Sequence, residues 1–329
     1  MSSDAAPFPT LSWRFWRAYG VTLRPYLLFV SGASGLVGLA LARTLRGSEL
    51  VAGAVAFFLC YGLGQAITDT FQTDTDALSS PYRPLVRGEI TSRQVLTVSL
   101  GALALIAFLF VSINPWTIVP AVLAIVGLVL YTPFKRRWWG GPPWNAWIVA
   151  MLPLIGFLLG GGTLGDALVR VDVWLAMGSI YFSYAVFVLL GYFKDVEADR
   201  ATGYDTVVVR FGRPVSVRLS ATHAALALVC SVLLVGMGRA PTASLDAAVV
   251  VGGVLWTMGA LATFAAHWRI AKTTRDEEAY PAVALVVAGY VALHLGEAAI
   301  LRPGLSLAAA LIFPLSVVVL VLRPEKTQV

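Results

Sequence analysis

The stretch LVAGAVAFFLCYGLGQAI, residues 50–67, decides the fold. It contains no charged residue and is long enough for one helical crossing of a lipid bilayer. Directly after it the chain becomes acidic, because TDTFQTDTD, residues 68–76, carries three aspartates. An uncharged helix that ends in a group of carboxylates indicates a membrane span with a candidate functional site at its charged end.

The composition extends this interpretation to the whole chain. Of its 329 residues 58% are hydrophobic and 13% are charged, and the mean hydropathy is +0.79, more apolar than a water-soluble domain requires. We therefore predict an all-α integral membrane protein, a polytopic bundle of nine or ten transmembrane helices around a central cavity. Ten apolar stretches qualify as spans: residues 25–45, 50–67, 95–113, 118–133, 146–162, 173–193, 219–236, 247–266, 283–300 and 305–322.

The distribution of lysine and arginine predicts the orientation of this bundle, because positively charged loops stay in the cytoplasm. With ten spans and a cytoplasmic N-terminus, the basic residues on the outer side are only Arg43, Arg46, Arg170, Arg239 and Arg302, out of 24 in the chain. Both termini are then cytoplasmic. The net charge of +6 reflects this bias, so we expect no nucleic-acid partner. Residues 1–23 mix tryptophan with arginine and are expected to lie along the lipid headgroups.

A second acidic segment ends the sixth predicted span on the same side of the membrane. It reads GYFKDVEADRATGYD, residues 191–205. If the second span continues as a helix beyond residue 67, Asp69, Gln72 and Asp76 project from one stripe of its surface. Asp195 and Asp199 are likewise one helical turn apart. The two segments therefore predict two groups of carboxylates at the same face of the membrane.

This pairing predicts how the domain is organised. We expect one transmembrane domain over residues 1–329, with two related halves, residues 25–133 and 144–329. Each half presents its acidic segment at the rim of the central cavity. Acidic residues at a helix end are often only solvated, but two such ends that face one cavity favour a shared site.

Carboxylates that crowd together repel one another, so a cation is expected among them. Mg²⁺ prefers carboxylate oxygens and commonly binds through one or two of them together with the phosphates of a substrate. Four basic residues stand near the acidic segments: Arg83, Arg87, Lys135 and Lys194. Carboxylates, a metal ion and a ring of cations together indicate a diphosphate site.

Three sequence motifs carry a resemblance to a known family. PYRPLVRGEIT at residues 81–91, YTPFK at residues 131–135 and KDVEADRATGYDT at residues 194–206 resemble the signatures of the UbiA superfamily of intramembrane prenyltransferases. They occur in order, each after a predicted span. The resemblance implies a helical bundle around a cavity, Mg²⁺-dependent ionisation of a prenyl diphosphate, and transfer of the prenyl group to a lipophilic or aromatic acceptor.

The resemblance also implies roles for individual residues. The expected metal ligands are Asp69, Gln72, Asp76, Asp195 and Asp199, and the four aspartates are thereby the expected catalytic residues. The expected diphosphate contacts are Arg83, Arg87, Lys135 and Lys194. The expected polar residues of the cavity wall are Thr68, Gln72, Tyr131 and Asn145. The first motif of the family reads Asn-Asp, then Asp, then Asp, so Thr68 and Gln72 depart from it. Because Gln72 supplies a neutral oxygen, the first half should hold its metal less tightly.

Several alternatives remain open from the sequence. A terpene cyclase would use the same ionisation, with the cation attacked by its own distant double bond. A secondary transporter also fits ten helices in two halves, although its polar groups would be expected near mid-membrane. Asp74 replaces the missing carboxylate at Gln72 only if the helix has broken there. His294 and Glu297 are ionisable residues at membrane depth. Either they have a function, or Glu297 simply forms an ion pair with Arg302.

Overall fold

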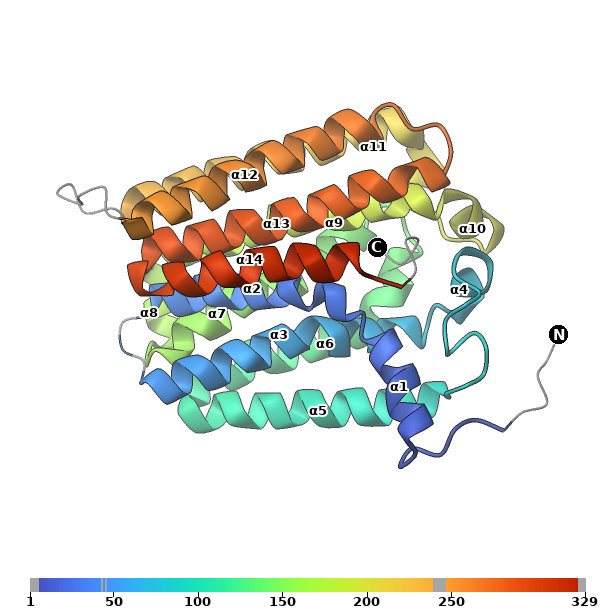
Figure 1. Ribbon diagram of the computed structural model, residues 1–329, viewed down its shortest axis with the longest axis horizontal. Coiled ribbons are helices and arrows are strands. Elements are labelled where there is room, and N and C mark those ends of the chain that lie inside the picture. Colours follow the sequence, from blue (N-terminus) through green and yellow to red (C-terminus); the bar gives the residue numbers. More distant parts are fainter. Residues whose placement is uncertain (1–5, 43, 45, 239–246, 325–329) are drawn as a thin grey trace.

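The computed structural model describes residues 6–42, 44, 46–238 and 247–324, and helices account for the regular structure of that part of the chain (Figure 1). The α-helices are α1 (Trp13–Thr22), α2 (Leu28–Leu41), α3 (Gly47–Asp69), α4 (Thr73–Ser79), α5 (Ser92–Ile113), α6 (Ile118–Lys135), α7 (Gly141–Leu159), α8 (Leu164–Val169), α9 (Val171–Gly191), α10 (Val196–Ala201), α11 (Val207–Gly238), α12 (Ala247–Ile270), α13 (Tyr280–Leu301) and α14 (Ser306–Val321). Short 3₁₀ helices are η1 (Pro25–Leu27), η2 (Pro115–Thr117), η3 (Tyr192–Lys194), η4 (Glu277–Ala279) and η5 (Pro303–Leu305). Within the described residues no strand occurs, so the all-α prediction is confirmed.

Nine helices of the described chain are long and apolar enough to cross a membrane. A tenth candidate is the pair Trp13–Thr22 and Pro25–Leu41, which is bent by 40°. The predicted bundle of nine or ten spans is therefore confirmed. The first predicted span corresponds to η1 and α2. Its predicted end at Leu45, like residues 1–5, lies outside the described residues.

Helix α13 lies deep inside the bundle. Of the most apolar 18 residues of this span 83% are buried, compared with 22% for α12. The two helices pack backbone to backbone at Gly259 and Gly296. A Cβ atom at Gly259 would lie 2.4 Å from the backbone nitrogen of Leu293, and one at Gly296 would lie 2.5 Å from that of Trp256. Such close approach needs small residues, and it supplies the packing that holds helices together in lipid.

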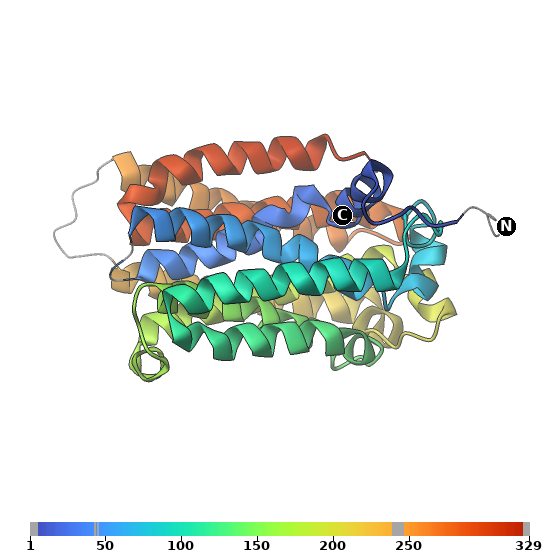
Figure 2. The same cartoon turned by 90° about the horizontal axis from the view of Figure 1, so that it is seen from below.

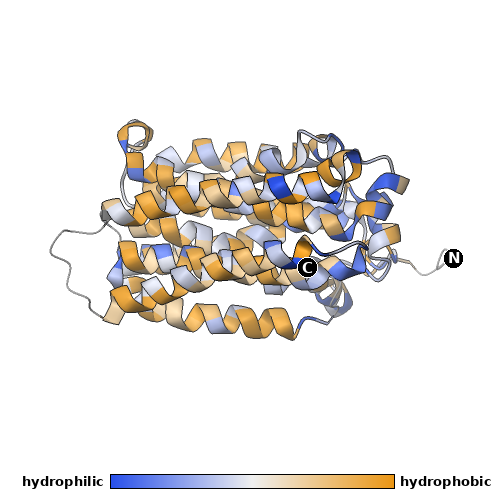
Figure 3. Cartoon of the chain, turned by 90° about the horizontal axis from the view of Figure 1, so that it is seen from above, coloured by the Kyte–Doolittle hydropathy of each residue, from blue (hydrophilic) through white to orange (hydrophobic). Residues whose placement is uncertain are grey.

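The polar segments gather at one end of the bundle. Helices α1, α4 and α10 lie at this end in two perpendicular views (Figures 1 and 2). Hydrophilic residues are concentrated at the same end, whereas the long helices are mainly hydrophobic along their length (Figure 3). The structure therefore places both acidic segments, which belong to α3 and α4 and to η3 and α10, on one side of the membrane-spanning part.

The helix of the second span does not continue through the first acidic segment, so the condition under which Asp69, Gln72 and Asp76 share one stripe is not met. Helix α3 ends at Asp69 and α4 begins at Thr73. In the intervening turn the hydroxyl of Thr70 donates a hydrogen bond to the carbonyl oxygen of Ile67 at 2.7 Å. Threonine hydroxyls compete in this way with the helical ladder. The backbone of Gln72, with φ −125° and ψ 21°, completes the break.

Candidate active site

A polar pocket lies where the two acidic segments meet, with an empty volume of about 650 Å³. Its charged lining residues are Arg24, Asp69, Asp76, Arg83, Lys135, Lys194 and Asp195. Gln72, Tyr131 and Asn145 also line it. The structure therefore brings together most of the side chains that the sequence predicted for the site, from both halves of the chain.

Arginines hold the carboxylates of the first segment. Nη2 of Arg24 donates to the two oxygens of Asp69 at 2.9 and 2.8 Å, and Nε2 of Gln65 donates to Oδ1 of Asp69 at 2.6 Å. Arg83 pairs with Asp76, and its Nη1 atom lies 3.7 Å from Oδ1 of Asp69. Burial raises the pKa of the Asp76 carboxyl, although the Arg83 guanidinium opposes this rise. The negative charge of this segment is thus largely neutralised by the protein itself.

Lys135 connects the two segments. Its Nζ atom donates to Oε1 of Gln72 at 2.8 Å and lies 3.8 Å from Oδ1 of Asp199. The same atom lies 5.7 Å from the ring centroid of Tyr192, within range of a cation–π interaction. The neutral side chain at position 72 therefore accepts a hydrogen bond from a buried cation.

The second segment keeps carboxylate oxygens without partners. Lys194 donates to Oδ2 of Asp195 at 2.8 Å. Oδ1 of Asp195 and both carboxylate oxygens of Asp199 are buried, and no group in the described part of the chain hydrogen-bonds them. Burial raises the pKa of Asp199 to about 6. Burial alone would also raise the pKa of Asp195, but the ammonium groups of Lys194 and Lys135 outweigh it and hold that pKa below its ordinary value. Because unpartnered buried carboxylates are costly, these oxygens mark the place where a cationic ligand would bind.

Three predicted residues are not part of the lining of the polar pocket: Asp199, Arg87 and Thr68. Asp199 lies beside the pocket, with Oδ1 3.8 Å from Nζ of the lining residue Lys135. The side chain of Arg87 is 60% exposed, and its Nη1 atom lies 3.4 Å from Oε1 of Glu89. Thr68 lines a neighbouring cavity instead. The side chain of Arg87 therefore points into solvent and is not placed to contact a diphosphate in the pocket.

Asp74 also points away from the pocket, although the helix has broken beside it. Its Oδ2 atom accepts a hydrogen bond from Nη2 of Arg136 at 2.7 Å, and its Oδ1 atom accepts one from Oη of Tyr204 at 3.2 Å. The Asp74 side chain is 41% exposed. It ties α4 to the loop after α10 and does not take the place of a carboxylate at Gln72.

Sequence analysis missed Arg24, which it counted only as one more cytoplasmic charge. The residue sits at the bend between α1 and η1, with a left-handed φ of +50°, and it is 8% exposed. Position 25 is a proline, which restricts the backbone of the residue before it. The available signal was a single arginine at the start of an apolar span, directly before that proline.

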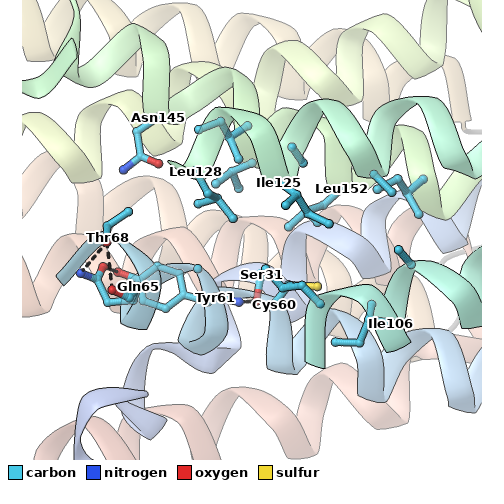
Figure 4. Close-up of a pocket in the computed structure, with 18 of the residues that line it drawn as sticks. Ser31, Cys60, Tyr61, Gln65, Thr68, Ile106, Ile125, Leu128, Asn145 and Leu152 are labelled. Carbon is cyan, nitrogen blue, oxygen red and sulfur yellow. Dashed lines mark hydrogen bonds between the residues drawn. The ribbon is translucent and has the colours of Figure 1, made fainter. Parts of the chain in front are cut away.

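An apolar cavity adjoins the polar pocket and has an empty volume of about 760 Å³. It lies between α2 and α3 on one side and α5, α6 and α7 on the other, and Figure 4 shows Tyr61 and Gln65 across from Leu128 and Asn145. The residues that line both cavities are Tyr61, Gln65, Asn145 and Tyr184. Several of the lining side chains on α5 and α6, such as Leu128, are only partly buried, and the cavity is not fully enclosed.

His294 and Glu297 form a fully buried network that lines neither cavity. Nδ1 of His294 lies 2.7 Å from Oε2 of Glu297, and Ser179 donates to Oε1 of Glu297 at 2.6 Å. Nε2 of His294 lies 2.7 Å from the hydroxyl of Ser183. The alternative that Glu297 pairs with Arg302 is wrong, because Arg302 donates to a backbone carbonyl of α2. The network joins α13 to α9.

Comparisons with known proteins identify related sequences and folds. The model of the UbiA prenyltransferase family matches residues 28–285. The digeranylgeranylglyceryl phosphate synthase of Natronomonas pharaonis is 31% identical over 213 residues, which are 64% of this chain and 75% of that protein. The protein of the same name from Thermococcus kodakarensis is 27% identical over 255 residues, 73% of this chain and 86% of that protein.

Two solved structures are similar in fold. A UbiA homologue from Archaeoglobus fulgidus bound to GPP and Mg²⁺ superposes with a TM-score of 0.63 at 19% identity, covering 85% of this chain and 99% of that one. The apo structure of a UbiA homologue from Aeropyrum pernix K1 gives a TM-score of 0.69 at 17% identity, covering 82% of this chain and 96% of that one. At these identities the similarity shows the fold.

Proposed function

The chain belongs to the UbiA prenyltransferase family, and from this premise we propose that it ionises a prenyl diphosphate with the help of Mg²⁺ and transfers the prenyl group to a lipophilic or aromatic acceptor. It is a multi-pass integral membrane enzyme. Membership of an enzyme family leaves the transporter hypothesis without support.

The observation that carries the proposal is the junction of the two cavities. The polar pocket offers cations and carboxylates for a diphosphate, and the apolar cavity offers room for the attached hydrocarbon. Tyr61 and Tyr184 belong to both walls, so their rings lie where the diphosphate ends and the prenyl chain begins. An amphiphilic substrate with an anionic head and an apolar tail matches this arrangement.

The donor set of the second segment fits Mg²⁺. Asp195 and Asp199 supply three buried oxygens that accept no hydrogen bond, and we propose them as the principal ligands. Of these, Oδ1 of Asp199 also lies 3.8 Å from the ammonium group of Lys135. Within the described ranges no group of three or more His, Cys, Asp or Glu side chains is arranged to hold a metal ion, so substrate phosphates would complete the coordination. Asp69, Gln72 and Asp76 remain proposed ligands of lower affinity, because a metal ion would have to displace the basic side chains that they now contact.

The side chains of the pocket account for the rest of the reaction. Bound Mg²⁺ would act as a Lewis acid toward the phosphate oxygens. Arg83, Lys135 and Lys194 would hold the negative charge that develops on the diphosphate as the C–O bond breaks. The faces of Tyr61 and Tyr184 would stabilise the allylic cation that remains. The apolar lining of the adjoining cavity would keep water away from that cation until the acceptor attacks.

The acceptor separates transfer from cyclisation. The names of the relatives favour an isoprenoid glyceryl phosphate as the first acceptor to test. Purified protein would be incubated with a prenyl diphosphate and Mg²⁺, first alone and then with this lipid or with an aromatic acid, and the products identified by mass spectrometry. A prenylated acceptor supports the proposal. A cyclic hydrocarbon or alcohol formed without any acceptor would replace it with the terpene cyclase alternative.

We further propose that the polar pocket opens toward the cytoplasm and that both termini lie on that side, as the positive loops indicate. The division into two related halves, residues 25–133 and 144–329 of a single domain, stays a prediction. Cysteine labelling of intact cells at exposed loop positions on each side of the bundle would test the orientation.

Filling the apolar cavity is expected to change the preference for donor length. Ala124 lines this cavity, whereas Val122 on the same helix is 47% exposed toward the lipid side. With Ala124→Phe the ring would occupy space needed by a long tail, so kcat/KM for a C20 donor relative to a C10 donor should fall about tenfold or more. Val122→Phe is the matched control and should leave the ratio unchanged. Equal ratios in both variants would mean that the tail binds elsewhere.

Metal affinity is expected to depend on pH through Asp199. Its raised pKa of about 6 means that the carboxyl gains a proton as the pH falls from 7 to 5, and a protonated carboxyl is a poor metal ligand. The affinity for Mn²⁺, measured by electron paramagnetic resonance as a probe of the Mg²⁺ site, should therefore weaken toward about tenfold per pH unit below pH 6. Asp199→Asn should bind more weakly at pH 7, with less pH dependence. A wild-type affinity that stays constant from pH 7 to 5 would contradict this assignment.

A further inference from the structure

Asp195 stands at the N-cap position of α10 but does not cap the helix. An aspartate at this position normally turns its side chain back to the backbone N–H of the second or third helical residue. Here the side chain makes no such bond. One oxygen accepts from Lys194, and the other is buried without a partner at the polar pocket. The backbone at Asp195, with φ −122° and ψ 15°, interrupts the helix between η3 and α10.

Asp276, from the loop before η4, supplies the missing cap. Its Oδ2 atom accepts a hydrogen bond at 2.8 Å from the N–H of Glu197, the second residue of α10. Arg213 donates to Oδ1 of Asp276 at 2.6 Å and to the carbonyl oxygen of Phe193 at 3.1 Å. The ion pair between Arg213 and Asp276 therefore supplies a hydrogen bond to the amide of Glu197, after the break, and one to the carbonyl of Phe193, before it. Helix ends leave such groups without intrahelical partners.

We infer that Asp276 is a positioning residue: by capping α10 from another loop, it leaves the carboxylate of Asp195 free to face the polar pocket. The side chains of Asp276 and Arg213 are only 14% and 18% exposed, so the pair is held within the protein rather than in solvent. Without Asp276, Asp195 itself, as the N-cap residue of α10, is in the position from which a side chain accepts a hydrogen bond from the free N–H of Glu197. Turning back to that amide would withdraw the carboxylate from the pocket. The inference rests on the proposed role of Asp195 as a ligand.

The test measures Mn²⁺ affinity in detergent-solubilised full-length protein, with and without Asp195. In the wild-type background Asp276→Ala should weaken Mn²⁺ binding about tenfold. In the Asp195→Asn background, which has already lost the ligand, Asp276→Ala should change the affinity less than twofold. A merely structural role would weaken binding by the same factor in both backgrounds. Asp276→Asn keeps an oxygen acceptor for the amide of Glu197, so at least half of the loss in log affinity caused by Asp276→Ala should be recovered. The same variant replaces Asp276→Ala in the comparison of the two backgrounds if the alanine variant does not fold.

Glu278→Ala is the matched control. Glu278 lies in η4, directly after this loop, and accepts hydrogen bonds from the loop amides of Thr274 and Arg275, so the variant disturbs the loop without uncapping α10. Its Mn²⁺ affinity should equal that of the wild type. The inference is overturned if Asp276→Ala binds Mn²⁺ within twofold of the wild type, or if its effect is the same in both backgrounds. If Asp195→Asn alone leaves the affinity unchanged, the ligand role of Asp195 fails, and the inference fails with it.

Discussion

Asp195→Asn is expected to lower kcat for release of diphosphate by on the order of 1000-fold, while the protein remains folded. The substitution keeps the shape of the side chain but removes the charge of a carboxylate that lines the polar pocket and has one free oxygen. Groups that stabilise developing charge in a buried site contribute factors of this size. Turnover would be measured as diphosphate released from a prenyl diphosphate at saturating Mg²⁺.

Asp205→Asn provides the control, because Asp205 belongs to the same acidic segment but is 41% exposed and pairs with Arg210. It should keep the wild-type rate within about twofold. An Asp195→Asn variant that retains more than a tenth of the wild-type turnover would show that the second segment does not hold the reacting diphosphate. Such a result would remove the basis of the proposed site.

Breaking the buried network of α13 is expected to have the largest effect on stability. In His294→Leu the carboxyl of Glu297 would remain at zero exposure, with the hydroxyls of Ser179 and Ser231 but no basic group as side-chain partners. Removing one member of a buried pair costs about 3–5 kcal/mol. The free energy of unfolding, measured by denaturant titration in micelles, should fall by that amount. Tyr290→Phe, which loses only a hydrogen bond to Ser34, should cost about 1 kcal/mol.

The double variant His294→Leu/Glu297→Leu distinguishes a structural pair from a functional one. Replacing both members by apolar residues removes the uncompensated group, so the double variant should be more stable than His294→Leu alone. It should also keep its catalytic activity, because neither residue lines the polar pocket or the apolar cavity. A double variant that folds but is inactive would return these residues to the list of functional candidates.

Hydropathy predicted the helices well where each span is flanked by charged or turn-forming residues. The predicted start of the fourth span at Ile118 coincides with the start of α6. The seventh span, predicted from Leu219, instead begins at Val207, because Arg210, Arg213 and Arg218 lower the hydropathy of a helix that continues past the apolar region. A kink at Gly212, with φ 77°, lies within that extension. Hydropathy reports contact with lipid, and a helix does not have to end where that contact ends.

The sequence predicted which residues form the site better than it predicted the contacts of those residues. The motifs predicted that Asp69 and Asp195 share one pocket, because both follow spans that end on the same side of the membrane. The partners of these carboxylates depend on tertiary packing, which spacing does not encode. Arg24 reaches Asp69 from the bend between α1 and η1, and Asp74, beyond the break at residues 70–72, contacts Arg136 instead of the pocket. Ion pairs between distant segments are decided by geometry that only the folded bundle supplies.

The incomplete enclosure of the apolar cavity has a kinetic consequence. If the donor enters from the bilayer through the wall that includes the partly buried Leu128, the enzyme samples a two-dimensional solution of its substrate. The velocity should then follow the mole fraction of donor within the vesicle lipid, and addition of inert phospholipid should slow the reaction even when the total amount of donor per millilitre is held constant.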